Sequence, residues 1–410
     1  MENHYIKSYP VDNGDTTLIG LIDSTTILID CKIRLSAEDP DDASKYDVKK
    51  DLLSSIHKRQ DNPFIDVFIL THPDKDHCHG FEKHFYCGAP ENYKKENREN
   101  DEIIIDEMWV TAMVFDSAES DDAKAVKKEA ERRRKLWDND SSEKDKSGNR
   151  IRMIGYNGDE RFENVPASVP GEIVNTINGS VKENFEFFIH SPFKKNLIAA
   201  SAEDNRNFSS IVMQARFKAS NSTTTITGRF MFGGDADHVI WEHILTKSEK
   251  NKNTEKLEWD LFISSHHCSW TYFNNVPYSD NDENKKPKES SLKILDYKRE
   301  GGKIIASCKL IKDDDDNPPH HPAKQEYVKK VKAENFLNTA AEPNAEQPEP
   351  IIFEVTVSGI QRTDKGAKAA ALRQVKNGIQ AGLIGTISTG KLAEVSEKVI
   401  VHQPHRFYGE

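Results

Sequence analysis

The feature that most constrains this chain is a cluster of metal-ligating side chains in residues 71–80, Thr-His-Pro-Asp-Lys-Asp-His-Cys-His-Gly. The cluster directly follows an apolar, β-branched run at 64–70, which is typical of a strand that delivers its last residues to a sheet edge. In a tight loop, His72 and Asp74 point one way, while Asp76 and His77 can reach a second point nearby. The spacing therefore predicts a site for two adjacent metal ions.

The patterns around this loop favour a layered α/β fold. Two β segments at 17–22 and 26–30 are joined by a turn at 23–25, and 48–58 has a helical pattern. Strand signals return in four short segments separated by polar loops and helices, at 185–190, 210–217, 229–232 and 261–265. Such an alternation indicates sheets covered by helices.

Composition divides the chain into parts. Residues 90–158 are highly charged and contain a helical pattern at 121–137, so we expect a charged helical insertion there, although 103–114 has the pattern of a buried strand. A Pro- and Glu-rich stretch at 341–350 predicts a linker. We therefore expect a main domain at 1–340 and a small α+β unit at 351–410.

Further apolar runs end in residue types that bind metals. They are 27–30, which ends in Asp30, 187–190, which ends in His190, 232–235, which ends in Asp235, and 261–269, which contains His266 and His267. With the His-x-Asp-x-Asp-His loop, this order resembles the metallo-β-lactamase fold superfamily. The resemblance covers about residues 5–335 and implies an αββα sandwich with a metal-dependent hydrolase activity.

Within that superfamily, the motifs look closest to the hydrolase domain of ComEC-type DNA-uptake proteins. The shared features are Asn207-x-x-Ser210 before an apolar strand, Gly-Asp-Ala at 234–236, the double histidine, and Asn-x-x-x-His-Pro at 317–322. Cys268 stands where that subgroup usually has glycine, and no membrane channel accompanies the domain.

The resemblance implies a ligand set for two divalent cations. His72, Asp74 and His190 would bind one ion, Asp235 would bridge both, and the second ion would be bound by Asp76, His77 and one histidine of the pair His266 and His267. We favour His266 as the ligand, because it directly ends its strand and neighbouring side chains there diverge. With Asp74 in place of a histidine, Mn²⁺ or Mg²⁺ competes with Zn²⁺ for the site.

The expected nucleophile is a hydroxide between the ions, so no side-chain nucleophile is needed. Asp76 and Asp235 are the expected catalytic carboxylates for the attack by this hydroxide. His267 or His321 would give a proton to the leaving group. Outside the ligands, Asp30 would orient the metal-binding loop, with Asn207 and Ser210 in similar supporting positions.

Charge and sorting signals limit the partners. The net charge of −11 disfavours generic polyanion binding, but the helix at 124–135 carries a local basic excess that could follow a phosphate backbone, with candidate contacts Lys127, Lys128, Arg132, Arg133 and Arg134. The most apolar stretch, 17–31, is interrupted by Gly20, Asp23 and Asp30, and the N-terminus lacks a signal-peptide pattern. Five scattered cysteines indicate reduced thiols. We therefore expect a cytoplasmic protein without a membrane partner.

Three functions are compatible with these sequence features. The first is a metal-dependent phosphodiesterase, with a nuclease as the favoured form. The second is a hydrolase of a small phosphodiester, ester, amide or thioester. The third is a binding or scaffold protein that keeps the fold without activity and docks a protein partner through 351–410.

Overall fold

The first of two large sheets contains the strand after which the metal-ligating loop begins. In the computed structural model, described for residues 3–34, 45–156, 158–203, 205–220, 223–279, 283–314, 318–364 and 366, this strand is β6 (Asn62–Ile69). The sheet order is β20 (Gly359–Arg362), β19 (Ile351–Thr356), β1 (His4–Ser8), β2 (Thr17–Gly20), β3 (Thr26–Ile29), β6, β7 (Ile104–Val110), β8 (Arg150–Ile154) and β9 (Ala167–Ser168), with β5 (His57–Arg59) on β6. From β3 to β9 neighbouring strands on this path are parallel, so their carboxyl ends lie at one edge.

The second sheet carries the later metal-ligating motifs. Its order is β10 (Ile173–Val174), β13 (Phe185–Ser191), β14 (Val212–Phe217), β15 (Gly228–Phe232), β16 (Trp259–Ile263), β17 (Lys298–Ala306) and β18 (Phe336–Asn338). The strands β15 to β18 are parallel. A short hairpin of β11 (Thr176–Ile177) and β12 (Ser180–Val181) and the two-residue β4 (Cys31–Lys32) complete the strands of the described residues.

Apolar side chains pack the two sheets face to face. One buried cluster lies between them, where Trp109 of the first sheet meets Phe187 of the second with ring centroids 5.5 Å apart. A second cluster joins the outer face of the first sheet to helices, and a third does the same for the second sheet. The result is a four-layer α/β/β/α arrangement, which confirms the expected α/β class.

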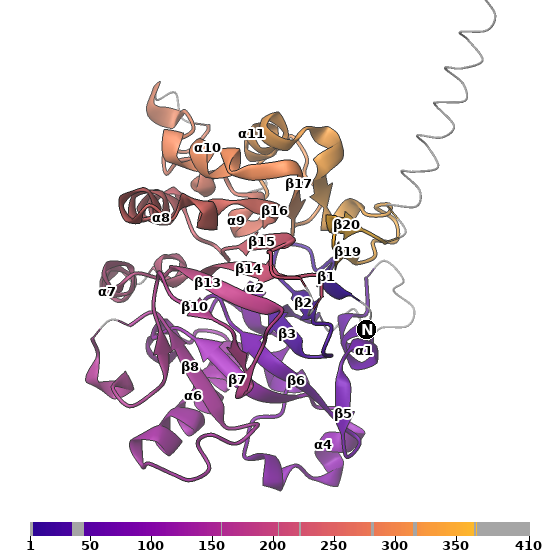
Figure 1. The fold of residues 1–410 in the computed structure, drawn as a ribbon, viewed down its shortest axis with the longest axis vertical. Helices are drawn as coiled ribbons and strands as arrows, with labels where there is room; N and C mark the ends of the chain where they lie inside the picture. The colour runs from indigo at the N-terminus through magenta and orange to yellow at the C-terminus, as the bar shows by residue number, and fades with distance from the viewer. Residues whose placement is uncertain are drawn as a thin grey trace, which may run out of the picture. The chain divides into compact units, whose positions relative to one another are not determined.

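Helices lie on both outer faces (Figure 1). In chain order they are α1 (Val48–Ser55), α2 (Lys75–Cys78), α3 (Phe81–His84), α4 (Lys95–Glu99), α5 (Met113–Asp116), α6 (Asp121–Asp138), α7 (Lys194–Glu203), α8 (His238–Asn251), α9 (Ser265–Cys268), α10 (Glu289–Asp296) and α11 (His321–Val331). None of the helices among the described residues has the length and hydropathy needed to cross a membrane.

The segment expected to be an insertion is part of the sheet. All seven residues of β7 are buried between β6 and β8, and α6 is the crossover that joins β7 to β8. The prediction of an insertion at 90–158 was therefore wrong for these strands. The prediction took a charged segment to be an exposed one. Arg133 of α6 is instead buried and donates hydrogen bonds to the carbonyls of Ile105 and Arg150.

The boundary predicted after the Pro-rich stretch is also displaced. Strand β19 pairs antiparallel with β1, with His4 opposite Val355, and β20 pairs with β19. Residues 341–350 are therefore a loop within the fold, and 351–362 are not a separate unit. The compact unit extends to Gly366. The rest of the predicted terminal unit, 367–410, lies outside the described residues.

Candidate metal centre

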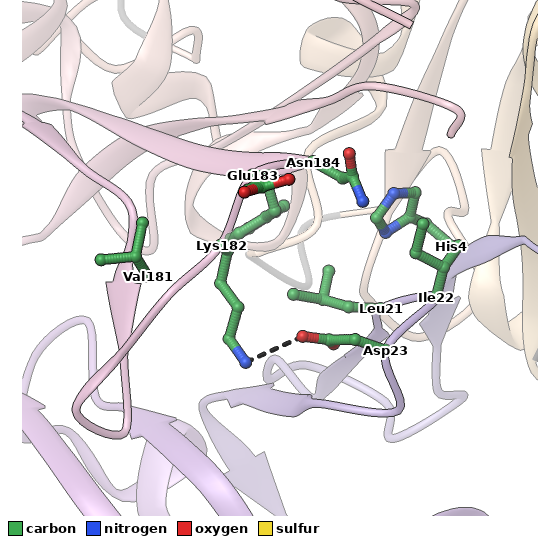
Figure 2. Close-up of a pocket in the computed structure, with 9 residues that line it drawn as sticks. His4, Leu21, Ile22, Asp23, Val181, Lys182, Glu183 and Asn184 are labelled. Atoms are coloured by element: carbon green, nitrogen blue, oxygen red, sulfur yellow. Dashed lines mark hydrogen bonds and ion pairs between the residues drawn. The ribbon is translucent and has the colours of Figure 1, made fainter. Parts of the chain in front are cut away.

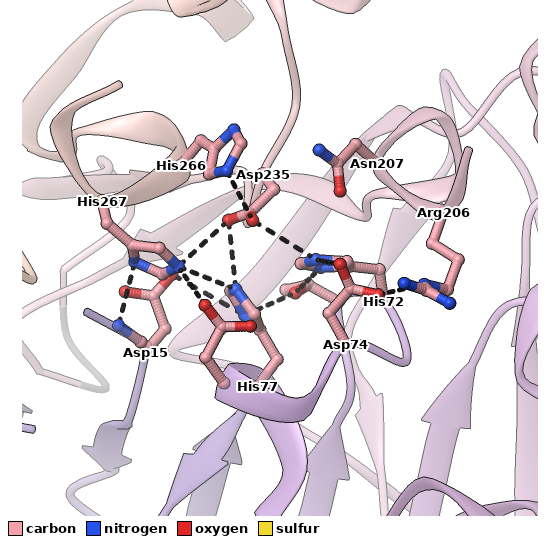
Figure 3. A network of polar contacts seen from close by, with 12 residues as sticks. Asp15, His72, Asp74, His77, Arg206, Asn207, Asp235, His266 and His267 are labelled. Carbon is pink, nitrogen blue, oxygen red and sulfur yellow. Dashed lines mark hydrogen bonds and ion pairs between the residues drawn. The ribbon is translucent and has the colours of Figure 1, made fainter. Parts of the chain in front are cut away.

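Loops at the carboxyl ends of parallel strands from both sheets form one polar cluster (Figure 3). His72, Asp74 and His77 come from the loop after β6 and from α2, Asp235 from the loop after β15, and His266 and His267 from the turn after β16. Ligand sites of open α/β sheets commonly lie at this end of the strands.

Asp235 lies at the centre of the cluster. Its Oδ1 is 3.0 Å from His77 Nε2 and 3.5 Å from His267 Nε2. Its Oδ2 is 3.5 Å from the Nε2 atoms of both His72 and His266. Each carboxylate oxygen thus faces a different group of ligand atoms, as a bridging ligand would.

The first group contains His72, Asp74 and Asp235, each with a potential ligand atom within 4.8 Å of the others. His72 Nε2 is buried and has no hydrogen-bond partner among the described residues. An unpaired buried nitrogen beside two carboxylates is costly unless a cation fills the gap, so these residues fit a divalent metal.

The second group contains Asp15, His77, Asp235 and His267, all buried and also with potential ligand atoms within 4.8 Å of one another. Asp76 borders it, with Oδ2 3.1 Å from His267 Nε2. Imidazole and carboxylate donors in this number suit a second divalent ion.

Two supporting residues fix the orientation of His77 and the loop before it. Asp30, at the end of β3, accepts hydrogen bonds of 2.7 Å from both the amide and the hydroxyl of Thr71. Its Oδ2 also lies 2.8 Å from His77 Nδ1, which turns Nε2 of that ring toward Asp235. Such an outer carboxylate fixes a ligand histidine. The family resemblance implies a related role for Asp30, namely that it orients the whole metal-binding loop.

Gly234 allows Asp235 to approach this loop. Its φ is +48°, and a Cβ at this position would lie 2.6 Å from Thr71 Oγ1. The loop after β15 therefore needs a glycine both for its left-handed backbone and for the contact with Thr71.

Both adjacent histidines face Asp235, contrary to our expectation that one of them points away. His266, His267 and Cys268 all have left-handed backbones, with φ of 49°, 53° and 65°. In such a turn successive side chains are rotated by about 100° instead of alternating across a strand. His267 is the one that joins the second metal-ligating group, whereas His266 is 23% exposed and lies at the solvent side. We had favoured the opposite assignment.

The carboxylates of the cluster dominate its electrostatics. Burial alone would lower the pKa of His72, but Asp235 and Asp74 raise that pKa to about 9. Burial likewise opposes protonation of His77, and Asp235 and Asp30 outweigh it and raise the pKa of His77 well above its usual range. The site thus has an excess of negative charge, which suits cations.

Two predicted site residues lie outside the cluster. His190, expected as a ligand, is buried in β13 with Nε2 3.0 Å from the carbonyl of Lys256, and burial lowers its pKa to about 4. His321, expected as a proton donor, begins α11 and contacts Asp313 at 3.3 Å. The β-bulge between Ile189 and Ser191, which a motif does not show, is where His190 leaves the regular register.

The segment 206–210 takes the position next to the first group. Figure 3 shows the Asn207 side chain directed toward Asp235 and His72. Arg206 forms an ion pair with Asp74 and another of 2.6 Å with Glu119. Ser210 is buried, and its amide donates to the Asn207 carbonyl. The Asn207 side chain therefore faces the ligand residues, while Ser210 supports the turn.

The basic helix offers fewer cations than its sequence indicates. Arg133 is 1% exposed and paired with Glu129 at 2.8 Å. Arg132 also contacts Glu129, and Arg134 contacts Asp138, each at 2.6 Å. The expected nucleic-acid contact is wrong for the buried Arg133, and of the five candidates Lys127 and Lys128 are the ones without an ion pair in the described structure.

Sequence reasoning missed Asp15. It lies in the turn between β1 and β2, far from any apolar run that ends in a ligand, so its only signal was the Gly-Asp pair before a strand. The fold brings it within the second group.

A pocket elsewhere lacks this chemistry. It has a volume of about 170 Å³ and lies beside His4, Leu21 and Val181 (Figure 2). The Lys182–Asp23 ion pair of 2.9 Å closes one side of it, and His4 Nε2 lies 2.9 Å from the Lys218 carbonyl. Lys182 and Asp23 thus pair with each other, and the residues that line this pocket do not form a metal-ligating group.

Comparisons with known proteins give only distant similarities. No protein-family model matches the sequence, and no curated protein matches it. Among solved structures, the chain is similar to a possible metal-dependent hydrolase from Veillonella parvula, with 10% identity over 85% of this chain and 98% of that chain and a TM-score of 0.36. An isothiocyanate hydrolase from Delia radicum gut bacteria has 11% identity over 85% and 99% of the two chains and a TM-score of 0.36. A long form RNase Z from yeast has 12% identity over 90% of this chain and 42% of that chain, with a TM-score of 0.33. TM-scores this low establish neither a shared fold nor a shared activity.

Proposed function

We propose that this protein is a metal-dependent hydrolase that uses two divalent cations. The observation that carries the proposal is the position of Asp235, whose two carboxylate oxygens face two separate groups of buried histidines and carboxylates. The order of strands and ligand-bearing loops also agrees with the resemblance to the metallo-β-lactamase fold.

Each part of the cluster has a distinct task in this proposal. Cations in the two groups would polarise the scissile bond and acidify a water molecule. His72 and Asp74 would hold one cation, His77 and His267 would hold the other with Asp76, and Asp235 would contribute to both positions. His266 is partly exposed, with Nδ1 3.2 Å from Thr271 Oγ1 and Nε2 3.5 Å from Asp235 Oδ2, so it would be the histidine at the solvent side that exchanges a proton with the leaving group.

For the substrate we propose a phosphodiester, and within that class a nucleic acid. The proposal rests on the ComEC-type motifs around Asn207, Asp235 and the double histidine. The carboxylate-rich donor set agrees with metal ions that bind phosphoryl oxygens, such as Mn²⁺ and Mg²⁺.

A small uncharged ester or amide is the second candidate, and the charge around the first metal group favours it. Glu119, whose side chain is 71% exposed, contacts Arg206 beside Asp74. With Arg133 buried and Arg132 paired, α6 offers fewer cationic side chains to attract a polyanion than its sequence indicates.

The test combines metal content with hydrolysis. Purified protein is dialysed, loaded with Mn²⁺, Zn²⁺ or Mg²⁺, and assayed for bound metal and for cleavage of single- and double-stranded DNA, RNA, cyclic nucleotides and aryl esters. We expect about two ions per chain and metal-dependent cleavage. Asp235→Asn should lower the rate by at least about 100-fold, because it weakens both cation positions together.

Asp237→Asn is the matched control. Asp237 is two residues further on and caps α8 through the amides of Val239 and Ile240, which an asparagine can also do. Equal loss in the two variants, or fewer than one ion bound per chain, would contradict the proposal. If the protein cleaves aryl esters but no nucleic acid and no cyclic nucleotide, the result would favour the second candidate function.

A further inference from the structure

We propose that Asp15 is an additional ligand of the second cation, next to His77, Asp235 and His267. The inference rests on the proposed function, since it assumes that cations occupy the cluster. It extends the ligand set beyond the residues that the sequence motifs supply, to a carboxylate from the β1–β2 turn.

The carboxylate of Asp15 has the burial and the unmet bonding capacity of a ligand. The residue is 5% exposed, and its Oδ1 has no hydrogen-bond partner among the described residues. Its Oδ2 lies 3.9 Å from His77 Nδ1, too far for a hydrogen bond. A buried carboxylate oxygen without a hydrogen-bond partner is costly, and a cation among these ligand atoms would offset that cost.

The turn that carries Asp15 is fixed to α2 and to the segment that follows β17. The Asp15 amide donates to the Asp76 carbonyl at 3.3 Å, and the Gly14 carbonyl accepts from the Ser307 hydroxyl at 2.6 Å. Gly14 is needed at this contact, because a Cβ there would lie 2.6 Å from the Asp76 carbonyl oxygen. Figure 3 shows Asp15 beside the His267 ring. The backbone thus holds the carboxylate in place before any cation arrives, as a ligand site requires.

Asp15 also changes the kind of cation that the second group prefers. With Asp15, Asp76 and Asp235, three carboxylates accompany two histidines in this group. Oxygen donors favour Mn²⁺ and Mg²⁺ relative to Zn²⁺. Loss of Asp15 should therefore weaken Mn²⁺ binding more than Zn²⁺ binding.

The test measures binding of Mn²⁺ and Zn²⁺ to the full chain by calorimetry, with the stoichiometry checked by elemental analysis. Asp15→Asn keeps the shape of the side chain and removes its charge. We expect the affinity of the second group for Mn²⁺ to fall by about 10–100-fold and its affinity for Zn²⁺ to fall less. The control is Asp12→Asn on the same turn, where Asp12 pairs with Arg34 and is 42% exposed, and we expect it to bind both ions as the wild type does.

Thermal unfolding separates a ligand from a merely structural residue. Without metal, Asp15→Asn should be at least as stable as the wild type, since the cost of burying the carboxylate charge is removed. With Mn²⁺ it should gain less in Tm than the wild type. Unchanged Mn²⁺ affinity, or a metal-free variant clearly less stable than the wild type, would overturn the inference. A wild type that binds no metal would instead overturn the proposed function.

Discussion

His190 and His267 show how local backbone geometry decides which histidines reach the candidate metal centre. His190 lies near the end of β13 and His267 follows β16, and both side chains are buried. Only His267 turns toward Asp235, because the chain enters a left-handed turn after β16. His190 instead lies against the Lys256 carbonyl. A motif gives the residue type and its place in the chain order, but not the direction of the side chain.

The buried His190 should make stability depend on pH. Its folded pKa of about 4 is below the unfolded value of 6.5, so the folded protein binds fewer protons between these values. Stability from this residue is fully present above pH 6.5 and is lost as the pH falls toward 4. The wild type should lose about 3 kcal/mol more than His190→Gln between pH 7 and 4. Urea unfolding at several pH values measures this, and a difference that does not vary with pH would contradict it.

At the scale of elements, the turn α9 combines function with backbone strain. Three consecutive non-glycine residues are left-handed, which costs about 1–2 kcal/mol for each. The third of these residues is Cys268, with φ of 65°, a backbone that glycine adopts without a Cβ penalty. The turn also explains why both histidines face Asp235, which a strand pattern does not predict.

Cys268 offers a direct measure of this strain. In ordinary backbone, alanine is more stable than glycine by about 0.5–1 kcal/mol. At Cys268 the order should reverse, so that Cys268→Gly is more stable than Cys268→Ala by about 1 kcal/mol, because glycine has no Cβ penalty there.

Cys308 is the matched control for this pair. It is also fully buried with a reduced thiol, and its backbone is not left-handed. There we expect the alanine variant to be the more stable one. Chemical denaturation of the four variants tests both orders, and the same order at both positions would rule out the strain.

At the scale of the whole molecule, sequence patterns gave the α/β class, the β2–β3 hairpin and the central loop. They failed where distant segments decide the outcome. Asp15 has no strand pattern leading into it, and its position depends on contacts of its turn with Asp76 and Ser307. Strand β19 alternates buried and half-buried residues like any strand, so only its pairing with β1 shows that it belongs to the first sheet.

The last strands should unfold together with the rest of the unit. Phe353 is fully buried between the sheets, so Phe353→Ala should lower the stability of the whole unit by about 3–5 kcal/mol in a single transition. Val357 lies just beyond β19 and is 75% exposed, and Val357→Ala should change stability by less than about 0.5 kcal/mol. Unfolding is monitored by fluorescence and circular dichroism. A separate early transition in Phe353→Ala would indicate an independent terminal unit.

The pairing of β1 with β19 sets a condition on how the protein is made. His4 cannot meet its partner Val355 until nearly the whole compact unit has left the ribosome. Until then the edge of β1 is open, and contacts so distant in sequence form slowly. The turn with Asp15 lies between β1 and β2 and is held by Ser307, so the candidate metal centre can assemble fully only after these later segments have been made. A truncated translation product would thus carry the signature loop at 71–80 without the complete candidate site.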